Sequence, residues 1–170
     1  MSQPFIAILM GSDSDLPIMK SSVEVLRSLK VNFEIKISSA HRTPAYTHSY
    51  VTDADQRGAV AFICAAGMAA HLAGAVAAAT TKPVIGVPIE SSLDGLDALL
   101  STVQMPGGIP VATVAIGKAG AKNAAYLAAQ IMAVADPELA ERVRVDRQAS
   151  ADLVIAKDQT LQAKIAAGEF

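Results

Sequence analysis

The segment SAHRTP, residues 39–44, brings together side chains that can handle protons and anions. Arg42 offers a planar fork of donors that suits a phosphate. The guanidinium of Arg42 disfavours a charged imidazole at His41, whereas a bound phosphate or carboxylate favours it. These opposing effects leave His41 able to donate or accept a proton near neutral pH. We therefore predict that His41 is an acid–base catalyst. The alternative is a turn histidine that bonds only to the backbone.

A second polar segment, GSDSD at residues 11–15, follows a short apolar run. Backbone N–H groups and serine hydroxyls at a helix start suit a phosphate. Asp15 would repel a phosphate, but its carboxylate can accept two hydrogen bonds from a ribose diol. The segment thus predicts a sugar-phosphate site. The alternative is structural, with Asp15 capping a helix and the serines forming a turn.

The segment AAGMAAH, residues 65–71, is small and apolar apart from its histidine. Gly67 and a helix predicted to begin near Ala69 can place N–H groups on a carboxylate while excluding water. His71 either lines this loop or is a core histidine with its hydrogen bonds satisfied, and the local sequence slightly favours the core. His48 is expected on the solvated face of a helix.

Five apolar, β-branched runs can position these segments, and their starts lie 25–28 residues apart. The runs are almost continuously apolar, as expected for parallel strands covered on both faces. Each interval is long enough for a helical crossover between parallel strands. The predicted strands are Phe5–Met10, Phe33–Ser38, Ala59–Cys64, Val84–Ile89 and Val111–Ile116.

Helix signals occupy the intervals between these runs. Prolines mark two helix starts, at Pro17 and Pro44, and limit two helix ends, before Pro83 and Pro106. The predicted helices are 16–29, 44–58, 69–80, 94–105 and 120–135. Asp136 then begins a last helical segment that accompanies no strand. We expect residues 136–170 to pack across a neighbouring subunit.

This pattern predicts a single α/β domain over residues 1–170. Its architecture is a three-layer α/β/α sandwich around a five-stranded parallel sheet, flavodoxin-like or Rossmann-like, with a C-terminal helical extension. Ligands of such sheets bind at the carboxyl ends of the strands. The three segments above, and a fourth at residues 88–92 (PIESS), all follow predicted strands. We therefore expect four loops to meet on one rim.

Composition excludes several classes of partner and location. The net charge is −2, and the chain has no basic stripe, so neither nucleic acid nor an anionic membrane surface is expected. The N-terminus has no basic region, and its apolar run is short, so neither a signal peptide nor a membrane span is expected. The single Cys64 excludes an internal disulfide and fits a reducing cytoplasm. The many small residues favour an oligomer.

Several common catalytic patterns are absent from the sequence. The three histidines lack metal-ligand spacing and no carboxylate cluster accompanies them, so no metal site is predicted. The sequence has neither a G-x-x-x-x-G-K-[ST] loop nor a G-x-G-x-x-G motif, so nucleoside triphosphates and dinucleotides are not indicated. No G-x-S-x-G elbow supports a serine nucleophile.

Five segments in order resemble the 5-(carboxyamino)imidazole ribonucleotide mutase family of purine biosynthesis: GSDSD, SAHRTP, AAGMAAHLAG, PVIGVP and LLSTVQMPGGIPVATVAIGKAGAKNAAYLAAQI. The similarity runs from about Ile6 to Ile131. It implies a three-layer α/β fold assembled as a homo-octamer, with a C-terminal helix reaching over a neighbour. The implied reaction moves a carboxylate from the exocyclic nitrogen of an aminoimidazole ribonucleotide to ring carbon C4, without ATP, metal or organic cofactor.

The resemblance also implies roles for individual residues. His41 matches the catalytic acid/base of the family. The positions that match substrate-binding residues are Ser12, Asp15 and Arg42, the phosphate-side Ser14 and Ser39, and Gly67 and His71 in the loop that closes over the carboxylate. One histidine can serve both proton transfers, because a proton is given to the exocyclic nitrogen and another is later taken from C4. Contacts to the phosphate and ribose would hold the ring and the released CO₂ together.

The sequence departs from the usual family pattern in the third loop. Met68 stands where a glycine is usual, Ala73 replaces a usual proline, and residues 90–95 form a loop about one residue shorter than typical. If a positive φ is required at residue 68, Met68 is strained or the loop is rearranged. Met68 would also narrow the pocket.

Two other functions stay open. One is the related direct carboxylase, which joins free CO₂ to the aminoimidazole ribonucleotide on the same fold. The segments AAHLAG and VQMPGG favour the mutase over this carboxylase. The other is a non-catalytic ribonucleotide-binding module, which would need the phosphate loops but not His41.

Overall fold

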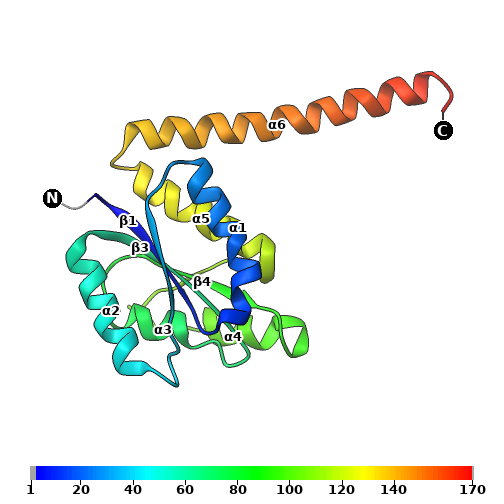
Figure 1. The fold of residues 1–170 in the computed structure, drawn as a ribbon. Helices are drawn as coiled ribbons and strands as arrows, with labels where there is room; N and C mark the ends of the chain where they lie inside the picture. Colours follow the sequence, from blue (N-terminus) through cyan, green and yellow to red (C-terminus); the bar gives the residue numbers. More distant parts are fainter. Residues whose placement is uncertain (1–2, 170) are drawn as a thin grey trace.

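The computed structural model describes residues 3–169 and shows a parallel sheet with helices on both faces (Figure 1). The sheet has five strands in the order β2-β1-β3-β4-β5, all paired in parallel. They are β1 (Phe5–Met10), β2 (Phe33–Ile37), β3 (Ala59–Gly67), β4 (Val84–Ile89) and β5 (Ala112–Thr113). This strand order is that of flavodoxin-like sheets. The predicted three-layer α/β architecture is confirmed.

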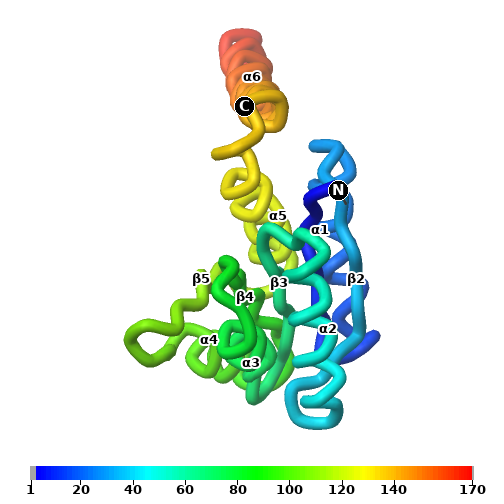
Figure 2. Tube along the Cα trace, turned by 90° about the vertical axis from the view of Figure 1, so that its left-hand side faces the viewer, coloured from blue at the N-terminus to red at the C-terminus, as the bar shows by residue number. Residues whose placement is uncertain are grey.

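The central strands β1, β3 and β4 bury side chains on both faces, which explains their continuous apolar runs. In β1, alternate residues such as Ile6 and Ile8 pack toward α1 (Leu16–Ser28) and α5 (Gly117–Ala133). The intervening residues pack toward α2 (Pro44–Arg57) and α3 (Leu72–Ala77). Figure 2 shows the two helical layers on either side of the strands. Two apolar cores therefore hold the sheet rigid beneath its loops.

The structure corrects the predicted bounds around the third loop. β3 runs three residues beyond Cys64, because Gly67 still pairs with Ile89 of β4. The following helix, α3, begins at Leu72, so the prediction of a helix start near Ala69 is wrong. Residues 68–71 are therefore a loop between β3 and α3.

Other predicted bounds also differ. β5 has two paired residues where six were predicted, because its register with β4 covers only Ile85 and Gly86. A single 3₁₀ turn (Leu93–Gly95) precedes α4 (Leu96–Val103). The fifth helix, α5, begins at Gly117, three residues before its predicted start.

The last helix, α6 (Pro137–Ala166), begins as the sequence predicts. The carboxylate of Asp136 accepts a hydrogen bond from the Leu139 N–H, at 3.0 Å, and Leu139 is buried. Beyond its first turns the helix projects away from the sheet (Figure 1). Its exposed apolar side chains include Leu153, Val154, Ile155, Leu161 and Ile165. Residue 170, the end of the predicted extension, lies outside the described residues. No helix within residues 3–169 combines the length and apolarity needed to cross a membrane.

Candidate active site

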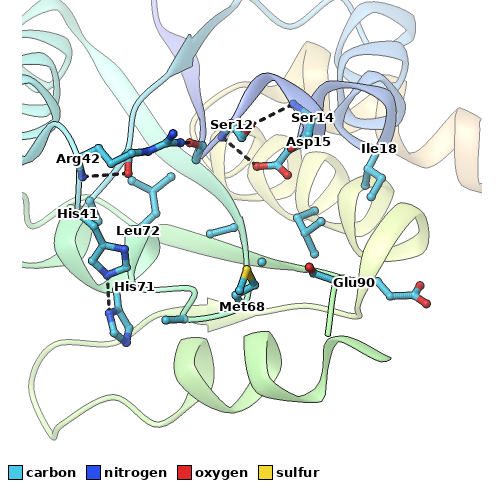
Figure 3. A pocket seen from close by; sticks show the side chains of 18 residues that line it. Ser12, Ser14, Asp15, Ile18, His41, Arg42, Met68, His71, Leu72 and Glu90 are labelled. Carbon is cyan, nitrogen blue, oxygen red and sulfur yellow. Dashed lines mark hydrogen bonds between the residues drawn. The ribbon is translucent and has the colours of Figure 1, made fainter. Parts of the chain in front are cut away.

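The loops after β1, β2, β3 and β4 line one cavity of about 660 Å³ at the carboxyl edge of the sheet (Figure 3). Small-molecule sites have volumes of roughly 300–1,000 Å³, so this cavity can hold one ligand of metabolite size. All eight residues singled out in the sequence line it: Ser12, Ser14, Asp15, Ser39, His41, Arg42, Gly67 and His71. The four loops thus meet on one rim, while the role of each residue stays a prediction.

The first loop is organised around Ser12 and Asp15. The Ser12 N–H donates to Asp15 Oδ2 at 3.2 Å, and the Ser14 N–H donates to Ser12 Oγ at 3.3 Å. Together they form a capping box around the 3₁₀ turn that precedes α1. The Asp15 side chain makes no capping bond to α1 itself. Asp15 therefore does not cap α1 directly, but its carboxylate completes the capping box of the turn before that helix, so the structural role stays open beside the predicted ligand role.

The Asp15 carboxyl is nearly buried, at 8% exposure, although it lines the cavity. Burial raises its pKa above the ordinary carboxyl value, and the hydrogen bond from the Ser12 N–H opposes that rise. A carboxylate has about four lone-pair sites, so Asp15 keeps acceptor capacity for a ligand. Such a group can accept hydrogen bonds from adjacent hydroxyls of a sugar.

Arg42 joins the second loop to the first. Its guanidinium Nη2 donates to the carbonyl oxygen of Gly11 at 3.0 Å, and its backbone N–H donates to Ser39 Oγ at 3.1 Å. Thr43 reinforces the turn, because its hydroxyl accepts the Ser39 N–H at 3.0 Å. The guanidinium therefore lies beside Ser12 and presents its remaining donors at the cavity (Figure 3).

His41 points away from Arg42, toward the third loop (Figure 3). Its Nε2 lies 2.8 Å from His71 Nδ1, and the two rings meet edge to face, with centroids 5.0 Å apart. Both histidines are exposed, so the interpretation of His71 as a core residue is wrong. His48 is exposed on α2 and lies outside the cavity lining, as predicted. The site thus has an imidazole pair on one side and Arg42 with Asp15 on the other.

Met68 has the left-handed backbone that the sequence raised as a possibility. Its φ is +54°, its side chain is 59% exposed, and it lines the cavity. A left-handed conformation costs a non-glycine residue roughly 1–2 kcal/mol. The chain therefore keeps a strained residue at the pocket, and the thioether occupies space that a glycine would leave open.

Sequence reasoning missed the residues that hold the third loop from outside. The Ala70 N–H donates to Ser101 Oγ of α4 at 3.0 Å. Glu90, an exposed carboxylate, and the apolar Ile18 also line the cavity (Figure 3). The signal for Ser101 lay inside the segment LLSTVQMPGG, but nothing in its spacing connects it with a loop some thirty residues earlier.

A model of the family described as AIR carboxylase matches residues 5–152. The chain belongs to the AIR carboxylase family. Among curated members, the N5-carboxyaminoimidazole ribonucleotide mutase of Pyrococcus abyssi is 54% identical over 146 residues, covering 85% of this chain and 83% of its own. The mutase of Bacillus subtilis is 49% identical and covers 94% of this chain and 99% of its own.

A solved structure within this family supports the same fold. The crystal structure of Treponema denticola PurE matches with a TM-score of 0.85 at 32% identity, covering 94% of this chain and 99% of that chain. The resemblance identified from the five segments is therefore confirmed.

Two further features of this AIR carboxylase family member concern potential metal ligands and its thiol. Within residues 3–169, no three His, Cys, Asp or Glu side chains are grouped as metal ligands would be. Cys64 is fully buried in β3, and burial raises the pKa of its thiol far above the usual range. A buried neutral thiol is a poor nucleophile.

Proposed function

We propose that this chain is an N5-carboxyaminoimidazole ribonucleotide mutase, an isomerase of purine biosynthesis. It moves a carboxylate from the exocyclic nitrogen of its substrate to ring carbon C4. The observation that carries the proposal is the meeting of an imidazole pair, a guanidinium and a buried carboxylate on one cavity. The chain that builds this cavity is 49–54% identical to named mutases over most of its length.

The polar side of the cavity is proposed to hold the ribonucleotide. Arg42 binds the phosphate with the guanidinium N–H groups that do not bond to the Gly11 carbonyl oxygen. The hydroxyls of Ser12, Ser14 and Ser39 assist it. Asp15 accepts hydrogen bonds from the ribose hydroxyls. Hydrogen bonds within the first two loops, from the Ser12 N–H to Asp15 and from the Arg42 N–H to Ser39, hold these groups in position. Remote binding of this kind keeps a reacting ring in place while a small fragment leaves and returns.

His41 is proposed to carry the proton in both halves of the reaction. It first donates a proton to the exocyclic nitrogen, the N–C bond breaks with its electron pair staying on nitrogen, and CO₂ is released. The electron-rich C4 then attacks the CO₂ carbon and forms the new C–C bond. His41 finally takes the proton from C4 and restores the aromatic ring. The histidine ends in the state in which it began, so the net change is an isomerisation.

Gly67 and His71 are proposed to close the apolar side of the cavity over the carboxylate. Gly67 ends β3, where a Cβ would lie 3.1 Å from the Ile89 carbonyl oxygen, so the backbone itself forms the wall there. His71 contacts the reactive imidazole directly through the 2.8 Å hydrogen bond. A wall of small residues with few polar groups hinders the escape of CO₂ and the entry of water.

Assembly and location are part of the same proposal. We expect a cytoplasmic homo-octamer in which residues 136–170 pack on a neighbouring subunit. Support comes from α6, which leaves the body of the subunit and exposes apolar residues such as Leu153, Val154 and Ile155. Such a patch is typical of a contact surface. Light scattering on the full chain measures the subunit number, and a monomer would contradict this part of the proposal.

The function is tested by offering two substrates separately. The N-carboxylated ribonucleotide is supplied alone, and the uncarboxylated ribonucleotide is supplied with bicarbonate, while formation of the C4 carboxylate is followed. Turnover of the first substrate is expected. Turnover of only the second would identify the direct carboxylase instead. Turnover of neither, with ribonucleotide still bound, would identify a binding module.

A further inference from the structure

We propose that Ser101, on α4, is a positioning residue for the reaction. Its hydroxyl fixes the loop of residues 68–71 and thereby sets the contact between His71 and His41. The proposed mutase function is needed only for the kinetic consequence, because the structural part concerns the imidazole pair in the free protein.

One hydroxyl of α4 holds the loop at Ala70. The Ala70 N–H donates to Ser101 Oγ at 3.0 Å. The neighbouring Thr102 hydroxyl lies 3.4 Å from the Ala70 carbonyl oxygen and gives its hydrogen to the nearer Ala98 O, at 2.7 Å. Ala70 is 1% exposed, whereas Ser101 is half-buried. A buried N–H without a partner costs roughly 1–3 kcal/mol. The loop is therefore held from outside at the residue immediately before His71.

The orientation of the Ser101 hydroxyl is itself determined. Its single hydrogen has three acceptors within reach: Asp97 O at 2.7 Å, Ala98 O at 3.2 Å and Met68 O at 3.3 Å. Donation to Asp97, the nearest, leaves the lone pairs of Ser101 free to accept the Ala70 N–H. An alanine at this position removes that acceptor and leaves the helix backbone unchanged.

Helix α4 is a fixed support for this hydroxyl. Gly86 of β4 lies directly beneath it, where a Cβ would be only 2.3 Å from Thr102 Cγ2. The Thr102 side chain is buried and its hydroxyl donates to Ala98 O at 2.7 Å. The helix thus rests against the backbone of the sheet with no room to shift inward.

The other restraints on the loop are the packing of Ala70 and Leu72 and local backbone hydrogen bonds, such as that from the His71 N–H to Ala69 O at 2.8 Å. Met68 is strained at a φ of +54°, and α3 has six residues and no side-chain cap from His71. Within residues 3–169, the His71 ring makes its polar contact with the His41 ring. A change of backbone at Ala70 therefore moves the His71 ring away from His41.

The test uses the full chain labelled with ¹⁵N at its three histidines, and measures ring-nitrogen chemical shifts at one fixed pH. Ser101→Ala is expected to change the signals of His41 and His71 and to leave those of His48 unchanged. Ser28→Ala is the matched control, because the Ser28 hydroxyl donates only to Val25 O of its own helix, at the far end of α1. The control is expected to leave all three histidines unchanged.

Kinetics supply a second readout. Ser101→Ala is expected to lower kcat about 10- to 100-fold with little change in KM, because the proposed phosphate and ribose contacts are untouched. Ser101→Thr, which keeps the hydroxyl, is expected to recover most of the rate. If Ser101→Ala does not fold, Ser101→Cys keeps a weaker acceptor and is expected to show smaller changes in the same direction.

Unchanged signals of His41 and His71 in folded Ser101→Ala, or equal changes in Ser28→Ala, would overturn the proposal. These spectra need no substrate. A wild-type chain without mutase activity would therefore refute the proposed function and leave the positioning role of Ser101 to be decided by the spectra alone.

Discussion

His41 Nε2 and His71 Nδ1, on loops thirty residues apart in the chain, lie 2.8 Å apart and share one hydrogen. At such a contact one imidazole donates and the other accepts. The contact fixes the orientation of the His41 ring relative to the loop that carries His71. A change at His71 therefore reaches the imidazole that is proposed to carry the proton.

Replacement of His71 tests whether the pair acts as a unit. His71→Asn removes the ring that contacts His41 Nε2, so the orientation of His41 is lost. We expect kcat to fall about 10- to 100-fold while ribonucleotide binding changes little. Steady-state kinetics and calorimetry measure the two quantities. His48→Asn, on the exposed face of α2, is the control and should behave as wild type. A His71→Asn enzyme with normal kcat would show that His41 needs no partner.

Arg42 is predicted to recognise the phosphate. Arg42→Ala should weaken binding of the ribonucleotide about 10- to 100-fold, because a hydrogen bond to a charged group is worth roughly 1.5–3 kcal/mol. The corresponding nucleoside, which lacks the phosphate, should bind wild type and variant equally. Arg42→Lys keeps the positive charge but not the planar fork of donors. Its affinity for the ribonucleotide should lie between those of wild type and Arg42→Ala. Equal losses for nucleotide and nucleoside would place the phosphate elsewhere.

Asp15 gives a pH-dependent prediction for stability. Because burial raises its pKa in the folded chain, the folded state binds this proton more tightly than the unfolded state. Its contribution to stability is therefore full below the ordinary carboxyl pKa and is lost as the pH rises through the raised folded value. Asp15→Asn removes this loss of stability, because the amide stays neutral at every pH.

At neutral pH, Asp15→Asn should therefore unfold at a higher temperature than wild type, by about 2–4 °C for each roughly 1 kcal/mol gained. The difference should disappear when the pH is lowered below the ordinary carboxyl range. The same variant should bind ribonucleotide more weakly. Thermal unfolding across pH checks the first point, and a stability gap that widened in acid would contradict the assignment.

Two substitutions of Met68 separate the effect of backbone strain from the effect of side-chain bulk. Met68→Gly removes both the left-handed strain and the thioether, whereas Met68→Ala keeps the strain and removes only the thioether. Since strain relief of about 1–2 kcal/mol is offset by the greater freedom of unfolded glycine, about 0.5–1 kcal/mol, we expect the glycine variant to be the more stable. Denaturant unfolding measures both variants. Equal stabilities would mean that the loop relaxes around residue 68.

The sequence predicted the buried parts of the fold best. The strands β1 and β4 begin and end where predicted, because each is a continuous apolar run whose side chains are buried on both faces. The start of α3 was misplaced because Ala69 and Ala70 are as compatible with a loop as with a helix, and no capping residue marks Leu72. The run at residues 111–116 is longer than the stretch that pairs with β4, which is Ala112 and Thr113, so β5 was predicted too long.

The sequence named residues that line one cavity, but it did not predict how their side chains are arranged. His41 and Arg42 are adjacent in the chain, yet their side chains point to different loops, and no local pattern encodes that divergence. His71 lies between Ala70 and Leu72, which are both buried, so its apolar neighbours suggested the core, although its own ring is exposed. The support from Ser101 depends on a contact between distant segments, which spacing along the chain does not reveal.

The central claim is that the His41 imidazole carries the proton to and from the substrate. The most direct measurement is the rate of C4-carboxylate formation by His41→Asn at a substrate concentration at which calorimetry shows the variant to be saturated. Loss of a general acid–base group costs about 10²–10⁴-fold, so we predict at least a hundredfold lower rate with affinity retained. A saturated His41→Asn enzyme turning over at close to the wild-type rate would contradict the account.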